Sequence, residues 1–271
     1  LYSNIWAKRN TAFGSQCLYT NGAISNFGEA LVGVGYKSLY SNRNHNNTAV
    51  GSNSMWQLGA DIASNSQYNT AIGSNNLVTI TNDAVSNVAI GNAAGNTNWK
   101  GERSVYIGKS ADTDHQSEGK HIVIGYNAVV DDFYKILLGN SNIQGLYCKV
   151  GLTTDSDKRI KKDIQDSTLG LEFIKNLRPV SYKKVNPADY PEPLLHDRFK
   201  GDDPDNREED NETRYDGLIA QEVEQTLKDI GMSWSGHKIN ESNGKQSIQY
   251  GALVVPLIKT VQELKARLEV L

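Results

Sequence analysis

The sequence predicts a mainly β, repetitive N-terminal half of the β-helix or β-roll kind, and an α+β C-terminal module that ends in a long, coiled-coil-forming helix. Three observations lead to this fold class. A short motif recurs through the first half, the Gly- and Asn-rich composition stops near residue 155, and apolar residues follow a heptad spacing at the C-terminal end. We therefore expect two domains, residues 1–155 and residues 156–271.

The repeated motif consists of Asn, a small residue, Ala, an aliphatic or β-branched residue, Gly, and then polar and small residues. Its strict and looser copies, in chain order, are NTAFGSQCL (10–18), GVGYKSL (33–39), NTAVGSNSM (47–55), NTAIGSNNL (69–77), NVAIGNAAG (87–95), SVYIGKSA (104–111), HIVIGYNAV (121–129) and KILLGNSNI (135–143). The aligned glycines are Gly14, Gly35, Gly51, Gly73, Gly91, Gly108, Gly125 and Gly139, at intervals of 14 to 22 residues.

Each copy predicts one short strand, because alternation turns one set of side chains inward and the glycine permits a tight turn or a close backbone approach. A unit of this size cannot bury its own apolar face, whereas a stack of units can. The expected inward residues are small, as at Ala49, Ala71 and Ala89, which suits thin stacked layers. An ordinary β-sandwich with Gly-rich turns is the alternative.

The pattern changes after residue 156. In residues 166–177, Asp166 or Ser167 is the expected cap of a helix with apolar residues at helical spacing. RPVSYKKV (178–185) predicts a strand, and the acidic, aperiodic stretch at about 196–216 predicts a solvated loop. Residues 217–231 predict an amphipathic helix that stops at Gly231.

The final segment, about 252–271, has the strongest helical pattern in the chain. Its apolar residues are spaced by four and three, as in the a/d seam of a coiled coil, and they are Leu257, Val261, Leu264, Leu268 and Leu271. Two heptads are too short to associate alone, so a helix packed on its own module is one interpretation. Self-association that the rest of the module assists is the interpretation we favour.

A serine and a lysine stand at the change of pattern, in DSDKRIKKDI (155–164). Ser156 could be an ordinary helix cap, or it could be a nucleophile with Lys161 as its base. Lysine acts as a base only in its neutral form, which burial and nearby cations favour. The neighbouring Lys158, Arg159 and Lys162 supply such cations, but spacing alone does not decide between the two interpretations.

Composition limits the classes of function. The formal net charge of −3 and pI near 6.0 do not favour nucleic acid or anionic membranes as partners, and no apolar run reaches membrane-spanning length. We expect no cofactor and no metal. Cys17 and Cys148 lie far apart without metal-ligand spacing, and we expect both to be buried thiols, with a disulfide between them as the alternative. The sequence offers no G-x-S-x-G elbow for a hydrolase that acts on separate substrates.

Two resemblances follow from these motifs. The repeats resemble the head repeats of trimeric bacterial adhesins and the shafts of phage fibres. Four blocks in residues 156–271 resemble the endosialidase-type intramolecular chaperone domain, an autoproteolytic module that ends many phage tail fibres and spikes. These blocks are SDKRIKKDI, LEFIKNLRPVSYKK, GLIAQEVEQ and IQYGALVVPLIKTVQELKARLE.

The second resemblance implies the site. The opening serine and the lysine five residues on form the cleavage dyad of that family, here Ser156 and Lys161, and the cut falls at the Asp155–Ser156 bond. Many members carry a histidine just ahead of the G-x-I-A-Q block, where this chain has Tyr215 and Asp216. Candidate supporting residues are Asp157, Arg159, Tyr215, Asp216 and Gln221.

The resemblance also implies the biology. We expect a homotrimer whose module folds the β-structured fibre in the host cytoplasm and then releases itself, with the fibre carried on the virion. The expected partners are the upstream part of a phage tail fibre and a host cell-surface receptor. Because the sequence starts without Met, we expect a piece of a longer chain. A trimeric adhesin whose module never cuts, and a hydrolase acting in trans, are the alternatives.

Overall fold

The computed structural model describes residues 8–20, 28–58, 65–78, 84–97, 101–114, 119–131, 133–140, 142–143, 145–195, 212–241 and 243–270. The chain divides into two compact units, Leu1–Gln144 and Gly145–Leu271. We call them the repeat unit and the C-terminal unit, and each is described by itself. The predicted boundary at 155/156 lies within the extended start of the C-terminal unit and stays a prediction.

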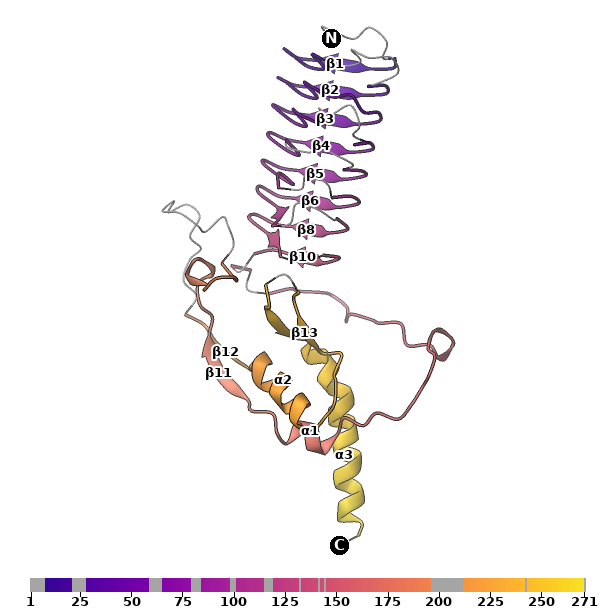
Figure 1. Ribbon diagram of the computed structural model, residues 1–271, viewed down its shortest axis with the longest axis vertical. Helices are drawn as coiled ribbons and strands as arrows, with labels where there is room; N and C mark the ends of the chain where they lie inside the picture. The colour runs from indigo at the N-terminus through magenta and orange to yellow at the C-terminus, as the bar shows by residue number, and fades with distance from the viewer. Residues whose placement is uncertain are drawn as a thin grey trace. The chain divides into compact units, whose positions relative to one another are not determined.

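The repeat unit is a β-solenoid, as the sequence predicts (Figure 1). Eight of its strands form one parallel sheet: β1 (Thr11–Phe13), β2 (Val32–Val34), β3 (Thr48–Val50), β4 (Thr70–Ile72), β5 (Val88–Ile90), β6 (Val105–Ile107), β8 (Ile122–Ile124) and β10 (Ile136–Leu138). β7 (Asp112–Thr113) and β9 (Val129–Val130) pair in a second parallel sheet. Neighbouring rungs pair in parallel and in sequence order, which excludes the β-sandwich alternative.

The glycine of every repeat stands directly after its strand and has a positive φ, between +83° and +140° for the eight aligned glycines. The column is tight: a Cβ on Gly51 would lie 1.9 Å from the carbonyl oxygen of Gly73, and one on Gly73 would lie 1.7 Å from that of Gly91. Real Cβ atoms do not approach this closely, so glycine is required both for conformation and for space.

The solenoid interior holds alanines and a ladder of asparagines. The middle residues of three strands, Ala49, Ala71 and Ala89, are fully buried, as predicted. The Asn69 backbone N–H donates to Asn47 Oδ1 at 2.9 Å, and the next rung repeats this bond from Asn87 to Asn69. Buried side-chain oxygens thus satisfy buried backbone donors from one rung to the next, which explains why the motif begins with asparagine.

Several inward positions hold a residue other than alanine. Tyr106 is inward and fully buried in β6, and a Cβ on Gly95 would lie 2.9 Å from its ring. In β2 the inward residue is Gly33, where a Cβ would meet the Cys17 sulfur at 2.5 Å. Large and small inward residues therefore compensate one another between the rungs.

The C-terminal unit is α+β, as predicted. Its elements are η1 (Lys158–Ile160), α1 (Leu171–Ile174), β11 (Val180–Lys183), η2 (Pro187–Asp189), β12 (Arg214–Gly217), α2 (Ala220–Asp229), β13 (His237–Ile239), β14 (Gln246–Ile248), η5 (Tyr250–Leu253) and α3 (Val254–Leu268). β11 pairs antiparallel with β12, and β13 with β14. The core of this unit is formed by Phe173, Val223, Leu227 and Trp234.

Three expectations for this unit are corrected. The predicted cap at Asp166 or Ser167 is wrong: α1 is one turn long and follows Gly170. Glu263 in α3 caps it instead, since the Leu171 N–H donates to Glu263 Oε2 at 2.8 Å. A carboxylate that is 92 residues away leaves no local signal in the sequence.

The second correction concerns the predicted loop at 196–216. Residues 196–211 lie outside the described part, but Tyr215 and Asp216 belong to strand β12. Tyr215 is paired with Tyr182 of β11, and their ring centroids are 6.0 Å apart. Cross-strand aromatic contacts of this kind stabilise a strand whose own composition is polar. Third, Cys148 is exposed, whereas Cys17 is buried as expected.

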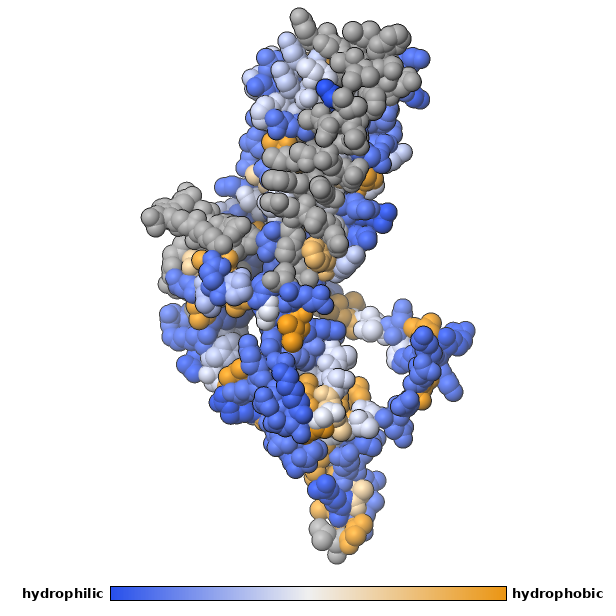
Figure 2. Space-filling model, in the orientation of Figure 1, coloured by the Kyte–Doolittle hydropathy of each residue, from blue (hydrophilic) through white to orange (hydrophobic). Residues whose placement is uncertain are grey.

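Helix α3 confirms the predicted C-terminal helix and leaves its apolar stripe uncovered in the single chain. Pro256 and Thr260 form its buried side. The predicted seam residues are exposed by 46% at Leu257, 66% at Val261, 43% at Leu264 and 71% at Leu268. Apolar residues accordingly appear at the surface over α3 in Figure 2. Leu271, the fifth seam residue, lies outside the described residues.

Candidate functional site

The predicted dyad lies in a long extended segment at the start of the C-terminal unit. All residues described from 145 to 168 are exposed to solvent, and η1 is the one regular element among them. This single 3-10 turn reverses the chain between Ser156 and Lys161. It is closed by backbone hydrogen bonds from Ile160 to Asp157 (3.2 Å) and from Lys161 to Lys158 (3.1 Å).

The turn brings the two dyad side chains together. The Lys161 Nζ donates to the Ser156 Oγ at 2.7 Å, a short hydrogen bond. Five residues would not align two side chains along one α-helix face, whereas one 3-10 turn between two extended residues does so here. The contact joins the nucleophile and base that the sequence singled out.

Asp157 and Arg159 form a second interaction within the same turn. Asp157 is the N-cap of η1, and its Oδ1 accepts from the Arg159 backbone N–H at 2.8 Å. The Arg159 guanidinium also donates to this carboxylate, at 2.7 Å from Nη2 to Oδ2 and 3.1 Å from Nε. These bonds hold the pKa of Asp157 below its usual value and raise the pKa of Arg159.

The remaining candidate supporting residues come from other elements. Tyr215 and Asp216 lie in β12, opposite Tyr182 and Ser181 of β11. Gln221 is in the first turn of α2. The structure therefore builds the dyad contact from one turn alone.

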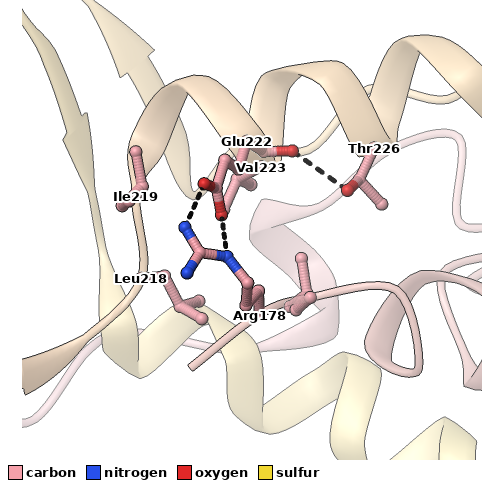
Figure 3. Close-up of a pocket in the computed structure, with 7 residues that line it drawn as sticks. Arg178, Leu218, Ile219, Glu222, Val223 and Thr226 are labelled. Atoms are coloured by element: carbon pink, nitrogen blue, oxygen red, sulfur yellow. Dashed lines mark hydrogen bonds and ion pairs between the residues drawn. The ribbon is translucent and has the colours of Figure 1, made fainter. Parts of the chain in front are cut away.

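The C-terminal unit also has a small pocket at the start of α2, which Figure 3 shows in close-up. It is lined by Leu177, Arg178, Leu218, Ile219, Glu222, Val223 and Thr226. Arg178 and Glu222 face one another across it in an ion pair, with Arg178 Nε 3.0 Å from Glu222 Oε2. The charged groups at this pocket pair with each other, and the dyad residues are not among its lining residues.

Other kinds of site find no support in the described residues. Among these residues, no group of three or more His, Cys, Asp or Glu side chains is placed to hold a metal ion. None of the helices in the described part of the chain has the length and hydropathy of a transmembrane span.

One comparison with known proteins matches the part of the chain that contains the dyad. Residues 156–232 match the family model described as chaperone of endosialidase. The match begins at the dyad serine and supports, in general terms, a chaperone and self-cleaving tail-fibre module. No curated protein and no solved structure matched the chain.

The sequence predicts the dyad, and it predicts Arg159 as a cation near Lys161, but it does not predict the contact between Asp157 and Arg159. The available signal for the turn was Asp157 itself, because Asp is a preferred residue at helix N-caps. Sequence reasoning also missed Glu263 as the cap of α1, and nothing local could have revealed it.

Proposed function

We propose that this chain is part of a phage tail fibre or spike whose C-terminal module drives trimerisation and folding of the β-solenoid and then cuts itself free at Asp155–Ser156. The hydrogen bond between Lys161 Nζ and Ser156 Oγ is the observation that carries this proposal. It occurs at the first residue of the chaperone match and in the segment that follows the solenoid in sequence. The substrate is then the chain itself.

The chemistry uses two side chains of this protein and one water molecule. The Ser156 Oγ attacks the Asp155 carbonyl carbon, while Lys161 Nζ accepts the hydroxyl proton. The carbon–nitrogen bond breaks, and the Ser156 nitrogen takes that proton to become a free amine. An ester then joins Asp155 to the serine oxygen. Water hydrolyses the ester, which leaves a carboxylate at Asp155 and an intact Ser156 at the new N-terminus.

The single chain supplies the contact but not the burial that this chemistry needs. General base catalysis requires the neutral amine, which desolvation and nearby cations favour. The dyad and its neighbours are exposed in one chain, so the missing desolvation would come from neighbouring copies. This makes cleavage a consequence of assembly, and it places the cut after folding.

The exposed stripe of α3 supports a homotrimer. Leu257, Val261, Leu264 and Leu268 lie next to the side of the helix that Pro256 and Thr260 bury, and they remain exposed. Burying such side chains against equivalent ones stabilises a complex by roughly 25 cal/mol per Å² of apolar surface. The spacing of four and three is the one that knobs-into-holes packing requires.

The outer face of the eight-stranded sheet supports the same assembly. The last residue of every strand points outward and is apolar, and these residues are Phe13, Val34, Val50, Ile72, Ile90, Ile107, Ile124 and Leu138. Phe13 is 75% exposed and Leu138 is 49% exposed. A second copy of the chain has the same strand spacing of about 4.8 Å, so it can match this face over many rungs.

A trimerising module would help the β-solenoid to fold, for a physical reason. Parallel pairing of short strands is slow and exposes strand edges before it is complete. A trimeric module that holds three chains in register lowers the entropic cost of nucleation. Cleavage of the Asp155–Ser156 bond afterwards separates the fibre from the module that folds it. The assembled fibre is then kinetically stable against unfolding. We place the fibre on the virion, facing a host receptor, and the module in the host cytoplasm during assembly.

A denaturing gel of freshly expressed protein with intact mass analysis tests this function. We expect a C-terminal fragment that begins at Ser156 and ends at Leu271. Ser156→Ala and Lys161→Ala should leave the chain whole and still folded. Fragmentation at the same bond in either variant would remove that residue from the dyad.

A trimerising module that never cuts is the second candidate. Two observations favour it: the dyad is exposed in the single chain, and Tyr215 and Asp216 stand where the resembled family often has histidine. Its expected result in the same experiment is an assembled wild-type protein that remains whole. Light scattering on that sample separates this outcome from a failure to assemble.

A further inference from the structure

We infer that Asp157 and Arg159 are positioning residues that hold the η1 turn in the conformation that brings Lys161 to Ser156. This inference rests on the proposed self-cleavage and names what aligns its dyad. We call the two residues the clasp. Neither touches the scissile bond in its proposed role, and both act through the backbone between the dyad residues.

The cap is the first half of the clasp. The backbone is extended at Asp157 (φ −64°, ψ 136°), forms the 3-10 turn, and is extended again at Lys161 (φ −115°, ψ 144°). A side-chain acceptor for the Arg159 N–H favours the turn over other conformations of an exposed chain. Without this acceptor the segment has only two backbone bonds to define the turn, those of Ile160 and Lys161.

The ion pair is the second half. The Arg159 guanidinium donates to both oxygens of the Asp157 carboxylate, in the bidentate arrangement that fixes direction as well as distance. Exposed ion pairs contribute little to global stability, so the expected effect is on local geometry. The pair also turns the Arg159 head group toward Asp157 and leaves the Ser156 hydroxyl to Lys161.

The clasp separates two requirements of the reaction. Alignment of Ser156 and Lys161 is already present in the single chain, because it is local to six residues. Desolvation of the pair is absent there, because the whole segment is exposed. Loss of the clasp should therefore slow the cut without changing assembly, and loss of assembly should slow the cut without changing the turn.

Four variants of the full chain test the clasp, with cleavage followed over time on denaturing gels and oligomeric state by light scattering. Asp157→Ala should slow cleavage by about 100-fold, the size of effect expected from a displacement of about 1 Å in an aligned site. Asp157→Asn keeps a good capping residue, so its loss should be several-fold smaller. Arg159→Ala should fall between them, and Arg159→Lys should not restore the wild-type rate, because lysine lacks the bidentate fork.

The pH dependence of cleavage is a second measurement, and it should not change if Asp157 and Arg159 only stabilise the fold. Asp157→Asn removes a carboxylate from the N-cap of the turn whose C-cap is Lys161, and loss of a negative charge favours the neutral amine, so half-maximal cleavage should occur at lower pH. Arg159→Gln removes a cation and leaves Asp157 unpaired, so half-maximal cleavage should move to higher pH. Asp166→Asn removes another exposed carboxylate, outside the turn, and should change neither the rate nor the pH dependence.

The outcomes separate the clasp from the proposed function. Trimeric Asp157→Ala and Arg159→Ala proteins that cut at the wild-type rate, while Ser156→Ala stays whole, would overturn the clasp and leave the self-cleavage standing. An assembled wild-type protein that stays whole would overturn both. Slow cleavage in trimeric clasp variants, with opposite pH displacements for Asp157→Asn and Arg159→Gln, supports the clasp.

Discussion

The asparagine that begins the strict copies of the repeat acts as a structural residue inside the solenoid. Asn69 accepts from the Asn87 backbone N–H and donates to the Ala84 carbonyl at 2.7 Å, and both partners are buried. A buried polar group that loses its partner is destabilising by about 1–3 kcal/mol. The asparagine ladder therefore contributes to stability at each rung where it occurs.

We predict that Asn69→Ala destabilises the repeat unit by about 3 kcal/mol, because it leaves one buried donor and one buried acceptor unpaired. The measurement is thermal unfolding of the uncut protein followed by the circular dichroism of its β structure. Asn92→Ala is the matched control, since Asn92 is exposed and the hydrogen bond from its side chain to the Ser74 carbonyl is 3.4 Å long. Equal losses in the two variants would contradict a structural role for the ladder.

The carboxylate of Asp112 gives the repeat unit a pH dependence. It accepts from the Thr97 N–H, the Thr97 hydroxyl and the Thr113 N–H, and the enclosing residues desolvate it. This desolvation raises the pKa of Asp112 to about 7, from an ordinary 3.8, against the opposing effect of these hydrogen bonds. The folded chain therefore binds more protons than the unfolded chain between these two pH values, and its free energy of unfolding falls as the pH rises through them.

We predict that Asp112→Asn flattens this dependence. The wild type should lose thermal stability between about pH 4 and pH 7, and the variant should lose clearly less over the same interval. Asp166→Asn, in the exposed segment of the C-terminal unit, changes the net charge equally and should keep the wild-type slope. Parallel slopes for the wild type and Asp112→Asn would assign the pH dependence to other groups.

The sequence predicts some residues of the candidate site and not others. Ser156 and Lys161 were identified because their types and their place at the change of pattern are visible in the sequence. Their contact depends on one 3-10 turn, and a turn of three residues has no periodicity to detect. The cap by Glu263 depends on a residue in a different helix, so it follows from the tertiary fold alone.

Among the elements, the rungs of the solenoid depend on the glycine column. Each aligned glycine has a conformation that L side chains rarely adopt. From Gly14 to Gly125, none of them leaves room for a Cβ against the backbone of the next rung. Steric overlap there involves backbone on both sides, and backbone cannot move aside without breaking the parallel ladder.

We predict that Gly73→Ala disrupts the solenoid locally, with a loss of more than about 3 kcal/mol, since it adds backbone overlap to an unfavourable φ. Hydrogen exchange should show lost protection in β4 and β5, the strands next to the substitution. Gly151→Ala is the control, because no atom lies within 4 Å of the added Cβ and the segment is exposed. Unchanged protection in Gly73→Ala would show that the column can relax.

The elements that sequence predicted correctly are those with a repeated local signal. The β strands of the solenoid recur with their glycines, and α2 and α3 have apolar residues at helical spacing. The errors fall on elements that a distant partner defines. Helix α1 begins at Leu171, where Glu263 accepts from the backbone N–H, and β12 pairs with β11.

For the whole molecule, the apolar surface that one chain leaves exposed is the feature to explain. It includes the outer face of the eight-stranded sheet, the stripe of α3 and the extended segment at 145–164, where Tyr147 is 96% exposed and Leu152 is 88% exposed. Exposed apolar patches of this extent mark interaction surfaces in soluble proteins. We predict a trimer for the uncut protein by light scattering with size-exclusion chromatography, and a monomer or dimer would contradict the assembly model.

We predict that cleavage depends on assembly. Replacing Leu264 and Leu268 with Asp places two charges in the exposed stripe of α3, where association would have to bury them. Trimerisation should be lost, and cleavage should fall by orders of magnitude although Ser156, Lys161 and the clasp are unchanged. Gln262→Asp with Ala266→Asp is the matched control, because it adds the same two charges at the same spacing on exposed positions outside the stripe.

The result distinguishes the two requirements of the dyad, alignment and desolvation. If the dyad needed alignment only, a monomer with an intact η1 turn would cut at the wild-type rate, since the Lys161–Ser156 contact already exists in one chain. Rapid cleavage by a monomeric Leu264→Asp, Leu268→Asp protein would therefore refute the dependence on assembly. A whole monomer beside a cutting control would show that the neighbouring chains supply the environment in which Lys161 can accept the serine proton.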